Sequence, residues 1–246
     1  MISNETRCIY QKNPLADVIC QLRFPEILTI ETELPAAFQE QIRDVFPRFL
    51  QRKEGLPGKQ TNNYQFTTAD GVYRVNLTSK FISLACVRYT RWEDFARMLD
   101  KPLAAFIQLY KPAYFERVGL RYLNFISRKE LELEDVPFRQ LISGCYLGIL
   151  AHEEVAENVT LRSTVDADTA LRGGCRCKLH AGPGTVRKGP KPDPETKFIL
   201  DLDLYMPGNL EVKLSAGALQ TLHSQSYGLF RGAITDTLHD AMEPIE

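Results

Sequence analysis

Two segments of the chain alternate apolar and polar side chains as half-buried strands do. Segment 18–24 has two faces, which carry Val18, Cys20, Leu22 and Phe24 on one side and Ile19, Gln21 and Arg23 on the other. Segment 115–126, Phe-Glu-Arg-Val-Gly-Leu-Arg-Tyr-Leu-Asn-Phe-Ile, has a similar alternation near the middle of the chain. Both contain a Leu-Arg-aromatic triplet, at 22–24 and 120–122. The pattern predicts two related strands.

The apolar positions that follow the two strands also correspond. Three of them recur 100 positions later (138 − 38, 142 − 42, 146 − 46), with Phe38 matched by Phe138, Ile42 by Ile142 and Phe46 by Tyr146. We therefore predict an internal duplication. The protein would be a single domain made of two pseudo-repeats, at about 10–112 and 113–243, and strand 115–126 would open the second repeat.

The pattern in the rest of the first half predicts two helices and three strands. Apolar residues at helical spacing indicate a helix over about 35–46 and a longer one over 92–110. Pro102 lies inside the longer helix and is expected to kink or split it. Strands are expected at 64–68, 72–77 and 80–89. The first two of these flank Asp70-Gly71, a sequence typical of tight hairpin turns.

The second half repeats this order of elements. A short helix is expected at about 137–146 and a final amphipathic helix at 219–238. The strands expected between them are 158–167, 174–180 and 198–205. Two segments dense in glycine and proline, 54–58 and 182–195, are expected to be loops.

Each half thus follows the order β-α-β-β-β-α. Strands joined by short turns favour antiparallel pairing, and amphipathic helices bury their apolar stripes against a sheet. We predict an α+β fold with a largely antiparallel, curved sheet built from the two halves. The long helices would pack on one face of the sheet, and the opposite face would be partly exposed.

Composition adds few constraints on function. Hydrophobic residues make up 44% of the 246 residues, charged residues make up 25%, and the net charge is −1. These values are ordinary for a soluble globular protein and give no overall attraction to nucleic acid or acidic membranes. The sequence shows no signal peptide and no apolar run long enough to span a membrane. The six cysteines fall mostly in apolar segments, which indicates a reduced, cytoplasmic protein.

Several pieces of the sequence together carry a family resemblance. They are Pro14-Leu15-x-x-Val18, Arg23-Phe24-Pro25, Tyr89-x-x-Trp92-x-x-Phe95, Arg117-Val-Gly-Leu-Arg-Tyr-Leu-Asn124 and Leu200-Asp201-Leu-Asp203. They resemble a sporadically distributed family of uncharacterised bacterial proteins over nearly the whole chain. The resemblance implies no catalytic motif. The patchy distribution of that family is similar to that of genes in mobile or phage-defence contexts.

Three arginines are the main candidates for ligand binding. Arg23, Arg117 and Arg121 are expected on the sheet face opposite Leu22 and Leu120. Guanidinium groups suit carboxylate or phosphate ligands. The alternative, which we favour, is that these arginines pair with aspartates across the sheet. Even so, this face is where a ligand or partner is expected first.

The segment 182–195 carries a second group of cations. Arg187, Lys188 and Lys191 give this expected loop a local positive charge. Segments of this length inside a domain are usually functional or disordered. We expect a mobile loop, with contact to a partner or polyanion as the less favoured reading. It does not match a P-loop, because Gly189 precedes a proline and no Gly-Lys-Ser/Thr enters a helix.

Paired carboxylates are the alternative candidates for chemistry. Asp201 and Asp203 project from one face of a strand, and Asp166 and Asp168 form a similar pair. Such groups can hold a divalent metal or divide acid and base roles. The same pattern is typical of a half-buried strand with its aspartates in water or paired with arginine, and this interpretation is favoured.

The motif Cys175-x-Cys177-x-x-His180 is the closest approach to a metal site. On a strand the two cysteines share a face and the histidine lies on the other, so we favour a plain strand. No metal ligand set and no cofactor is assigned. The four histidines lack companions at catalytic spacing, and no hydrolase, metalloprotease, Walker or dinucleotide motif is present.

The sequence therefore favours a binding module over an enzyme. We expect it to recognise a protein partner or a small anionic ligand on the exposed sheet face. One alternative is a metal-dependent hydrolase that uses Asp201, Asp203 and Asp166. Another is a nucleic-acid-binding protein, which the charge balance disfavours. No membrane partner is expected, and homo-oligomerisation stays open.

Overall fold

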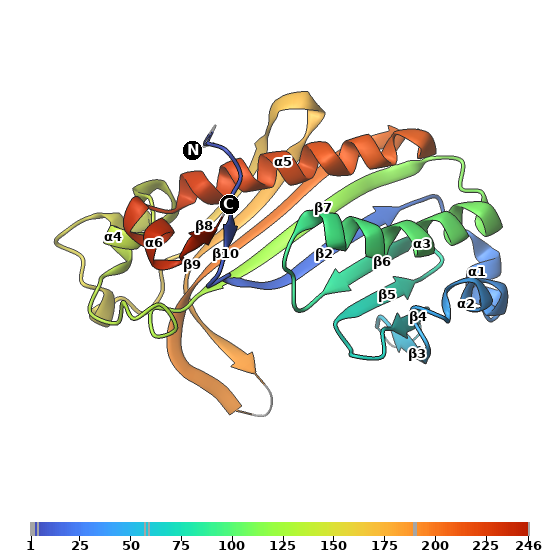
Figure 1. The fold of residues 1–246 in the computed structure, drawn as a ribbon, viewed down its shortest axis with the longest axis horizontal. Coiled ribbons are helices and arrows are strands. Elements are labelled where there is room, and N and C mark those ends of the chain that lie inside the picture. Colours follow the sequence, from blue (N-terminus) through green and yellow to red (C-terminus); the bar gives the residue numbers. More distant parts are fainter. Residues whose placement is uncertain (1–2, 4, 57, 59, 189–190, 246) are drawn as a thin grey trace. The chain divides into compact units, whose positions relative to one another are not determined.

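A computed structural model describes residues 3, 5–56, 58, 60–188 and 191–245, without the side chains of residues 188, 191 and 192. The chain forms two compact units (Figure 1). The first comprises Met1–Ala16, Arg121–Leu204 and Thr221–Glu246; the second comprises Asp17–Leu120 and Tyr205–Gln220. Each unit therefore combines segments that lie far apart in the sequence. The fold is α+β with an antiparallel sheet, as predicted, whereas the duplication stays a prediction.

Antiparallel strands form the sheet of the second unit. They are β2 (Leu15–Arg23), β3 (Arg48–Glu54), β4 (Thr61–Thr67), β5 (Tyr73–Leu77) and β6 (Phe81–Cys86). Hydrogen bonds join them in the order β3-β4-β5-β6-β2, and β7 (Phe115–Ile126) follows β2. The predicted Asp70-Gly71 turn joins β4 to β5, with Gly71 in the left-handed conformation at φ 77°.

The two faces of this sheet differ in character. One row of residues in register is apolar and consists of Cys20, Leu84, Val75, Phe66 and Phe49. The neighbouring row points to the opposite side and consists of Gln21, Ser83, Asn76, Gln65 and Leu50. The helices cover the apolar side, because the Phe38 ring lies 5.3 Å from that of Phe66. The opposite side is called the polar face below.

The helices of the second unit are α1 (Leu28–Thr32), α2 (Ala36–Ile42) and α3 (Trp92–Tyr110). Contrary to the prediction, Pro102 does not split the long helix: α3 is a single element through it. Pro102 is itself buried with the apolar stripe of the helix, and this packing offsets the one backbone hydrogen bond that proline cannot make. The helix ends at Lys111, whose φ of 46° is left-handed, before Pro112.

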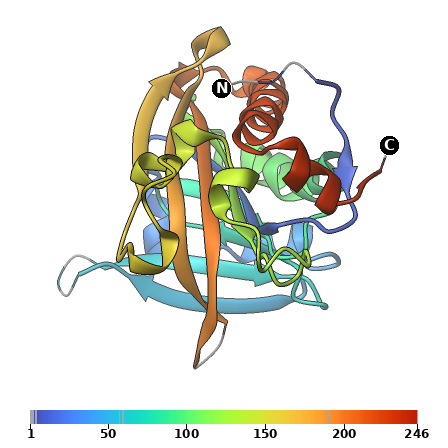
Figure 2. The ribbon, with the colours of Figure 1, turned by 90° about the vertical axis from the view of Figure 1, so that its left-hand side faces the viewer.

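The sheet of the first unit contains much longer strands. Its order is β7-β10-β9-β8, with β8 (Val165–Ala170), β9 (Arg176–Lys188) and β10 (Lys191–Leu210). Figure 2 shows β9 and β10 side by side in orange. A separate two-stranded sheet pairs β1 (Ile9–Tyr10) with β11 (Pro244–Ile245), so the two ends of the chain meet in this unit.

The helix α5 (Ser215–Ala233) covers one face of the sheet that β7, β10, β9 and β8 form. The hydroxyl group of Tyr122 on β7 lies 2.7 Å from Nδ1 of His223 on α5, and both residues are buried. Leu200, Leu202 and Leu204 of β10 are fully buried. The other helices of the unit are α4 (Phe138–Leu141) and α6 (Asp236–Ala241), with short 3₁₀ turns between β7 and β8.

Several segments differ from the prediction. The helix expected at about 137–146 is α4 only over Phe138–Leu141, and the single final helix expected over 219–238 is divided between α5 and α6. Strand β3 occupies residues for which no strand was predicted. The strand expected at 158–167 is instead a 3₁₀ turn, Glu157–Val159, followed by β8. The expected loop 182–195 is wrong for its described residues, which belong to the ends of β9 and β10.

Candidate functional site

Arg121 and the three candidate aspartates lie on the face of the first unit's sheet that is opposite Tyr122 and α5. Arg121 of β7 points to this face and meets Asp201 of β10. Its Nε donates to Oδ1 of Asp201 at 2.8 Å, while Nη2 donates to Oδ2. The favoured alternative is thus confirmed for this arginine: it pairs with an aspartate across the sheet, in the two-pronged geometry that guanidinium and carboxylate groups prefer.

The strands β8 and β9 continue this charged face. Their register places Asp166 opposite His180 and Asp168 opposite Lys178. Nδ1 of His180 lies 2.7 Å from Oδ1 of Asp166. Together with Arg121, Asp201 and Asp203, these residues line a shallow depression of about 440 Å³. Positive and negative side chains therefore alternate across neighbouring strands.

The depression brings the three candidate acids together, and two of them contact the side chains of Arg121 and His180. Asp201 accepts from Arg121, and Asp166 contacts His180. Among the residues that the structure describes, no group of three or more histidine, cysteine, aspartate or glutamate side chains is arranged to hold a metal ion. What the charged face can do chemically is form ion pairs with a partner that carries charges of both signs.

The two cysteines of the sequence motif lie away from this face. Cys175 and Cys177 are buried, each with 1% of its surface exposed, whereas His180 projects from the charged face. Burial raises the pKa of the Cys177 thiol to about 12, and the carboxylates of Asp203 and Asp201 add to the shift. A thiol in this position stays protonated at neutral pH. Cys177 and His180 lie on β9 with their side chains on opposite faces, whereas Cys175 directly precedes the strand.

Arg117 has a different partner from Arg121. Its guanidinium carbon lies 4.6 Å from the centre of the Tyr205 ring, in the second unit. Gly119, two residues further along β7, leaves room for this side chain, because a Cβ atom there would lie 2.2 Å from Nη1 of Arg117. Guanidinium groups that stack on aromatic rings keep their edge available for hydrogen bonds.

Arg23 lies at one end of the polar face in the second unit. Its side chain is exposed, and Nε donates to Oε1 of Gln21 at 3.0 Å. It lines a depression of about 480 Å³ together with Lys80, Glu26 and Glu116. The aspartate partner that the sequence suggested is therefore not the contact that Arg23 makes.

Three further arginines of the polar face were missed in the sequence. Arg48 and Arg52 alternate with Leu50 on β3, and the register places Arg48 opposite Thr67 and Arg52 opposite Asn63. Arg74 on β5 lies opposite Ala85 on β6. All three side chains are exposed. Segment 48–54 does alternate as a strand, with arginines at 48 and 52. Its apolar residues are exposed, so they did not mark a buried face from which the strand could be predicted.

The cations of segment 182–195 lie on a hairpin and not on a loop. Arg187 is exposed near the end of β9. The side chains of Lys188 and Lys191 lie outside the described part of the structure, so their role stays a prediction. Near the base of the hairpin, Lys197 is buried and contacts Asp193 at 3.2 Å, Glu130 at 3.4 Å and Glu195 at 3.6 Å.

Comparison with known proteins gives no relative: no family model matches the chain, and no curated protein matches it. The resemblance to the sporadically distributed bacterial family therefore stays a prediction. Within the described ranges, no helix has both the length and the apolar character that crossing a membrane requires.

Proposed function

We propose that the protein is a non-enzymatic binding module whose polar face in the second unit recognises an acidic segment of a protein partner. The observation that carries the proposal is the charge of that face. Its positions on β2 to β6 include four arginines and two carboxylates: Arg23, Arg48, Arg52, Arg74, Asp17 and Glu54. The first unit's charged face, in contrast, already pairs Arg121 with Asp201.

The four arginines are available for a partner. All are exposed, and no ion pair joins any of them to another residue in the described ranges. Glu54, which could have neutralised one of them, accepts instead from Nδ2 of Asn63 at 2.8 Å. Unpaired guanidinium groups bind carboxylates through two parallel hydrogen bonds. An acidic peptide would therefore find several such sites on one face.

Polar side chains between the arginines, on the same face of the sheet, support an ordered surface. Asn76 and Ser83 are 9% and 4% exposed, and Nδ2 of Asn76 donates to Oγ of Ser83 at 3.2 Å. Asn63 and Gln65 of β4 are also buried. Buried amides that are held by neighbouring strands fix the sheet surface from which the arginines project. A spread of cations over several strands suits an extended partner better than a single small anion.

A direct test uses a fluorescein-labelled polyglutamate peptide and fluorescence anisotropy. The variant R48Q/R52Q/R74Q should bind about tenfold more weakly, because three exposed ion pairs at ~0.5 kcal/mol each sum to roughly the free energy of a tenfold change. The matched control is Arg43→Gln, since Arg43 is exposed at the C-terminal cap of α2 and pairs with Glu40 at 2.9 Å. Equal binding by the triple variant and the wild type would refute the proposal.

Two further probes separate the related hypotheses. A single-stranded oligonucleotide that binds more tightly than polyglutamate, with a steep dependence on salt, would favour the nucleic-acid alternative. Inorganic pyrophosphate that competes with the peptide at equal concentration would favour a small anionic ligand. A polylysine peptide serves as the control of opposite charge and should not bind this face.

The hydrolase alternative concerns the first unit and stays a prediction. It would need Asp201, Asp203 and Asp166 to act on a bound metal. Metal analysis of the purified protein and of the Asp201→Asn variant is the test, and loss of bound metal in the variant would support it. We also propose a reduced, cytoplasmic setting, which is consistent with cysteines that are free in the described structure. The defence context is proposed from the family resemblance alone.

A further inference from the structure

Strand β3 is the terminal strand of the second unit's sheet, so one of its long edges has no neighbouring strand in the described ranges. It pairs with β4 in an unbroken antiparallel register, from Arg48 opposite Thr67 to Glu54 opposite Thr61. All seven of its residues are exposed. On such a strand, alternate residues point their backbone N–H and C=O groups away from the neighbour. A regular edge of this length is a template to which another chain can add a strand.

The outward backbone groups of β3 are not used within the part of the chain that the structure describes. No turn, loop or side-chain hydrogen bond reaches the backbone of residues 48–54 there. The side-chain hydrogen bonds of the strand run to β4, from Gln51 to Asn62 at 3.0 Å and from Asn63 to Glu54 at 2.8 Å. Neither a bulge nor a proline interrupts the strand, although both commonly protect an edge. The edge is therefore open over its whole length.

Contacts with β4 hold β3 in its extended shape. The Phe49 ring lies 5.3 Å from the ring of Phe66 and 6.4 Å from that of Tyr64. Strand β4 is itself fixed by its pairing with β5 and, near its start, by the backbone N–H of Asn62, which donates to the carboxylate of Glu31 at 3.0 Å. A strand that is already ordered lowers the entropic cost of adding another one.

The charges along this edge favour an acidic chain over a second copy of the protein. Arg48, Arg52 and Lys53 stand against one carboxylate, Glu54, so the strand has a net charge of +2 (3 − 1). Two copies paired edge to edge would bring two such strands together, and their like charges would repel. An acidic strand is attracted instead, because its charge is complementary to that of β3.

The alternation of β3 also determines where the acids and apolar residues of a partner strand lie. Arg48, Leu50 and Arg52 project on the polar face, whereas Phe49 and Lys53 project on the other side. Leu50 is 48% exposed and Phe49 is 43% exposed, so each can still bury apolar surface against an added chain. Neighbouring side chains on one face of a strand pair interact directly. The complementary strand therefore has acids opposite the three cations and apolar residues opposite Phe49 and Leu50.

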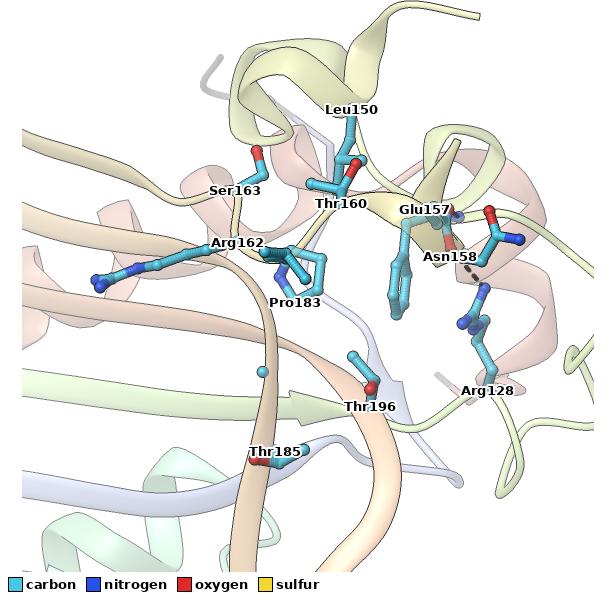
Figure 3. Close-up of a pocket in the computed structure, with 13 residues that line it drawn as sticks. Arg128, Leu150, Glu157, Asn158, Thr160, Arg162, Ser163, Pro183, Thr185 and Thr196 are labelled. Atoms are coloured by element: carbon cyan, nitrogen blue, oxygen red, sulfur yellow. Dashed lines mark hydrogen bonds and ion pairs between the residues drawn. The ribbon is translucent and has the colours of Figure 1, made fainter. Parts of the chain in front are cut away.

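The hollow beside Phe138 in the first unit offers less to a ligand (Figure 3). Nη1 of Arg128 donates to Oε2 of Glu157 at 2.9 Å, and the guanidinium carbon lies 4.0 Å from the centre of the Phe138 ring. The charges and the aromatic surface there are thus engaged within the protein. The edge of β3, in contrast, combines open backbone groups with exposed apolar and charged side chains.

We propose that β3 binds its partner by β-strand addition: an extended acidic segment of another protein pairs with the outer edge of β3 and lengthens the sheet by one strand. This inference rests on the proposed function, because it assigns the edge at which the acidic partner of the polar face binds. Backbone hydrogen bonds supply affinity, and the alternation of side chains supplies specificity. Aligned antiparallel to residues 48–53, the segment has the order acid-acid-polar-apolar-apolar-acid.

Fluorescence anisotropy with three labelled peptides tests the binding mode. The first is Glu-Glu-Thr-Val-Val-Glu, and the other two carry N-methyl groups on its second and fourth or on its third and fifth residues. An added strand turns only one of these sets of N–H groups toward β3. One methylated peptide should bind about thirtyfold more weakly, since two backbone hydrogen bonds at ~1 kcal/mol each are lost, and the other should bind like the first. Equal binding by all three would overturn the proposal.

Amide hydrogen exchange shows where the first peptide lies. The peptide should slow exchange in residues 48–54 and leave β8, the terminal strand of the first unit's sheet, unchanged. R48Q/R52Q should weaken the peptide about fivefold, because two exposed ion pairs at ~0.5 kcal/mol each are lost. The matched control is Arg74→Gln. Arg74 lies on β5, two strands away from the edge, so this variant should bind the peptide like the wild type.

The outcomes separate strand addition from the proposed function. Polyglutamate binding that R48Q/R52Q/R74Q weakens, without slower exchange in residues 48–54 when the patterned peptide is added, would keep the polar-face proposal and overturn strand addition. No binding of either peptide would refute both. Slow exchange in residues 48–54 that grows with protein concentration and needs no peptide would overturn the acidic partner and assign the edge to pairing between copies of the chain.

Discussion

The side chains of Arg121 and Asp201 form a two-pronged ion pair between neighbouring strands β7 and β10, with Nε and Oδ1 2.8 Å apart. Asp201 is 16% exposed and Arg121 is 44% exposed, so water screens the pair from the arginine side. The guanidinium group that was the leading candidate for ligand binding is thus engaged within the sheet. It stabilises the pairing of the strands.

A double-mutant cycle measures this pair. Arg121→Gln and Asp201→Asn should each lower the free energy of unfolding, and their coupling energy should be about 0.5–1 kcal/mol, the upper part of the range for exposed pairs. Urea denaturation of the four proteins gives the value. Because water screens the pair, the coupling should fall at high salt. Additive effects of the two changes would show that the contact contributes nothing.

The cysteines should differ sharply in reactivity. Cys177 is buried, and burial raises its pKa to about 12, whereas Cys145 is exposed. Thiolates are the reactive species, so iodoacetamide should modify Cys145 in the native protein and leave Cys177 intact until urea is added. Mass spectrometry of tryptic peptides provides the measurement. Early modification of Cys177 would contradict its buried position on β9.

Glu195 should make stability depend on pH. Burial by itself would raise its pKa, but hydrogen bonds from Ser127 and the Lys129 backbone, with the Lys197 charge, lower the pKa below the ordinary 4.5. The folded-state pKa is therefore the lower one, and the stabilisation is present above the ordinary value and lost as the pH falls through the folded value. Glu195→Gln should be destabilised at about pH 7 and nearly equal to the wild type at about pH 3.

Thermal melting at the two pH values tests this dependence. The matched control is Glu153→Gln, which changes an exposed glutamate in the first unit. Its melting temperature should follow that of the wild type at both pH values. A constant difference between Glu195→Gln and the wild type across this range would mean that the carboxylate is not held in its charged form.

Two glycines allow a matched comparison of backbone requirements. Gly182→Ala should cost about 2 kcal/mol or more, because the new Cβ would meet the Ser163 carbonyl oxygen at 2.4 Å and the φ of 154° disfavours a side chain. Gly217→Ala on α5 meets nothing within 4 Å and should be neutral or stabilise by up to about 1 kcal/mol. Chemical denaturation distinguishes them, and equal effects would contradict the packing at Gly182.

Much of the fold could be predicted because each face of a half-buried strand leaves a local signature. The alternation in segment 18–24 predicted β2 and both of its faces. Asp70-Gly71 predicted the hairpin between β4 and β5. Strand β3 was missed since every residue in it is exposed, including Phe49 and Leu50, so its apolar positions do not mark one buried face. A strand without a buried face has no such signature.

The hairpin of β9 and β10 was missed for another reason. Its glycines and prolines favour a loop locally, but distant contacts hold the strand. Ser127 donates to Glu195 at 2.9 Å across 68 positions, and the Lys129 N–H donates at 3.1 Å across 66. The candidate sites, like the fold, could be predicted only in part. Arg121 and Asp201 could be placed on one face, whereas the arginines of β3 and β5 needed the strand register.

The composition of the two units from interrupted segments also bears on synthesis by the ribosome. The first unit needs Met1–Ala16 together with Thr221–Glu246, and the second needs Tyr205–Gln220. Cys8 and Tyr227 illustrate this, since the Cys8 N–H donates to the Tyr227 hydroxyl group across 219 positions. The second unit therefore cannot close before residues 205–220 have left the exit tunnel, and the first cannot close before residues 221–246 have left it, so neither unit can complete its fold from its earlier segments alone.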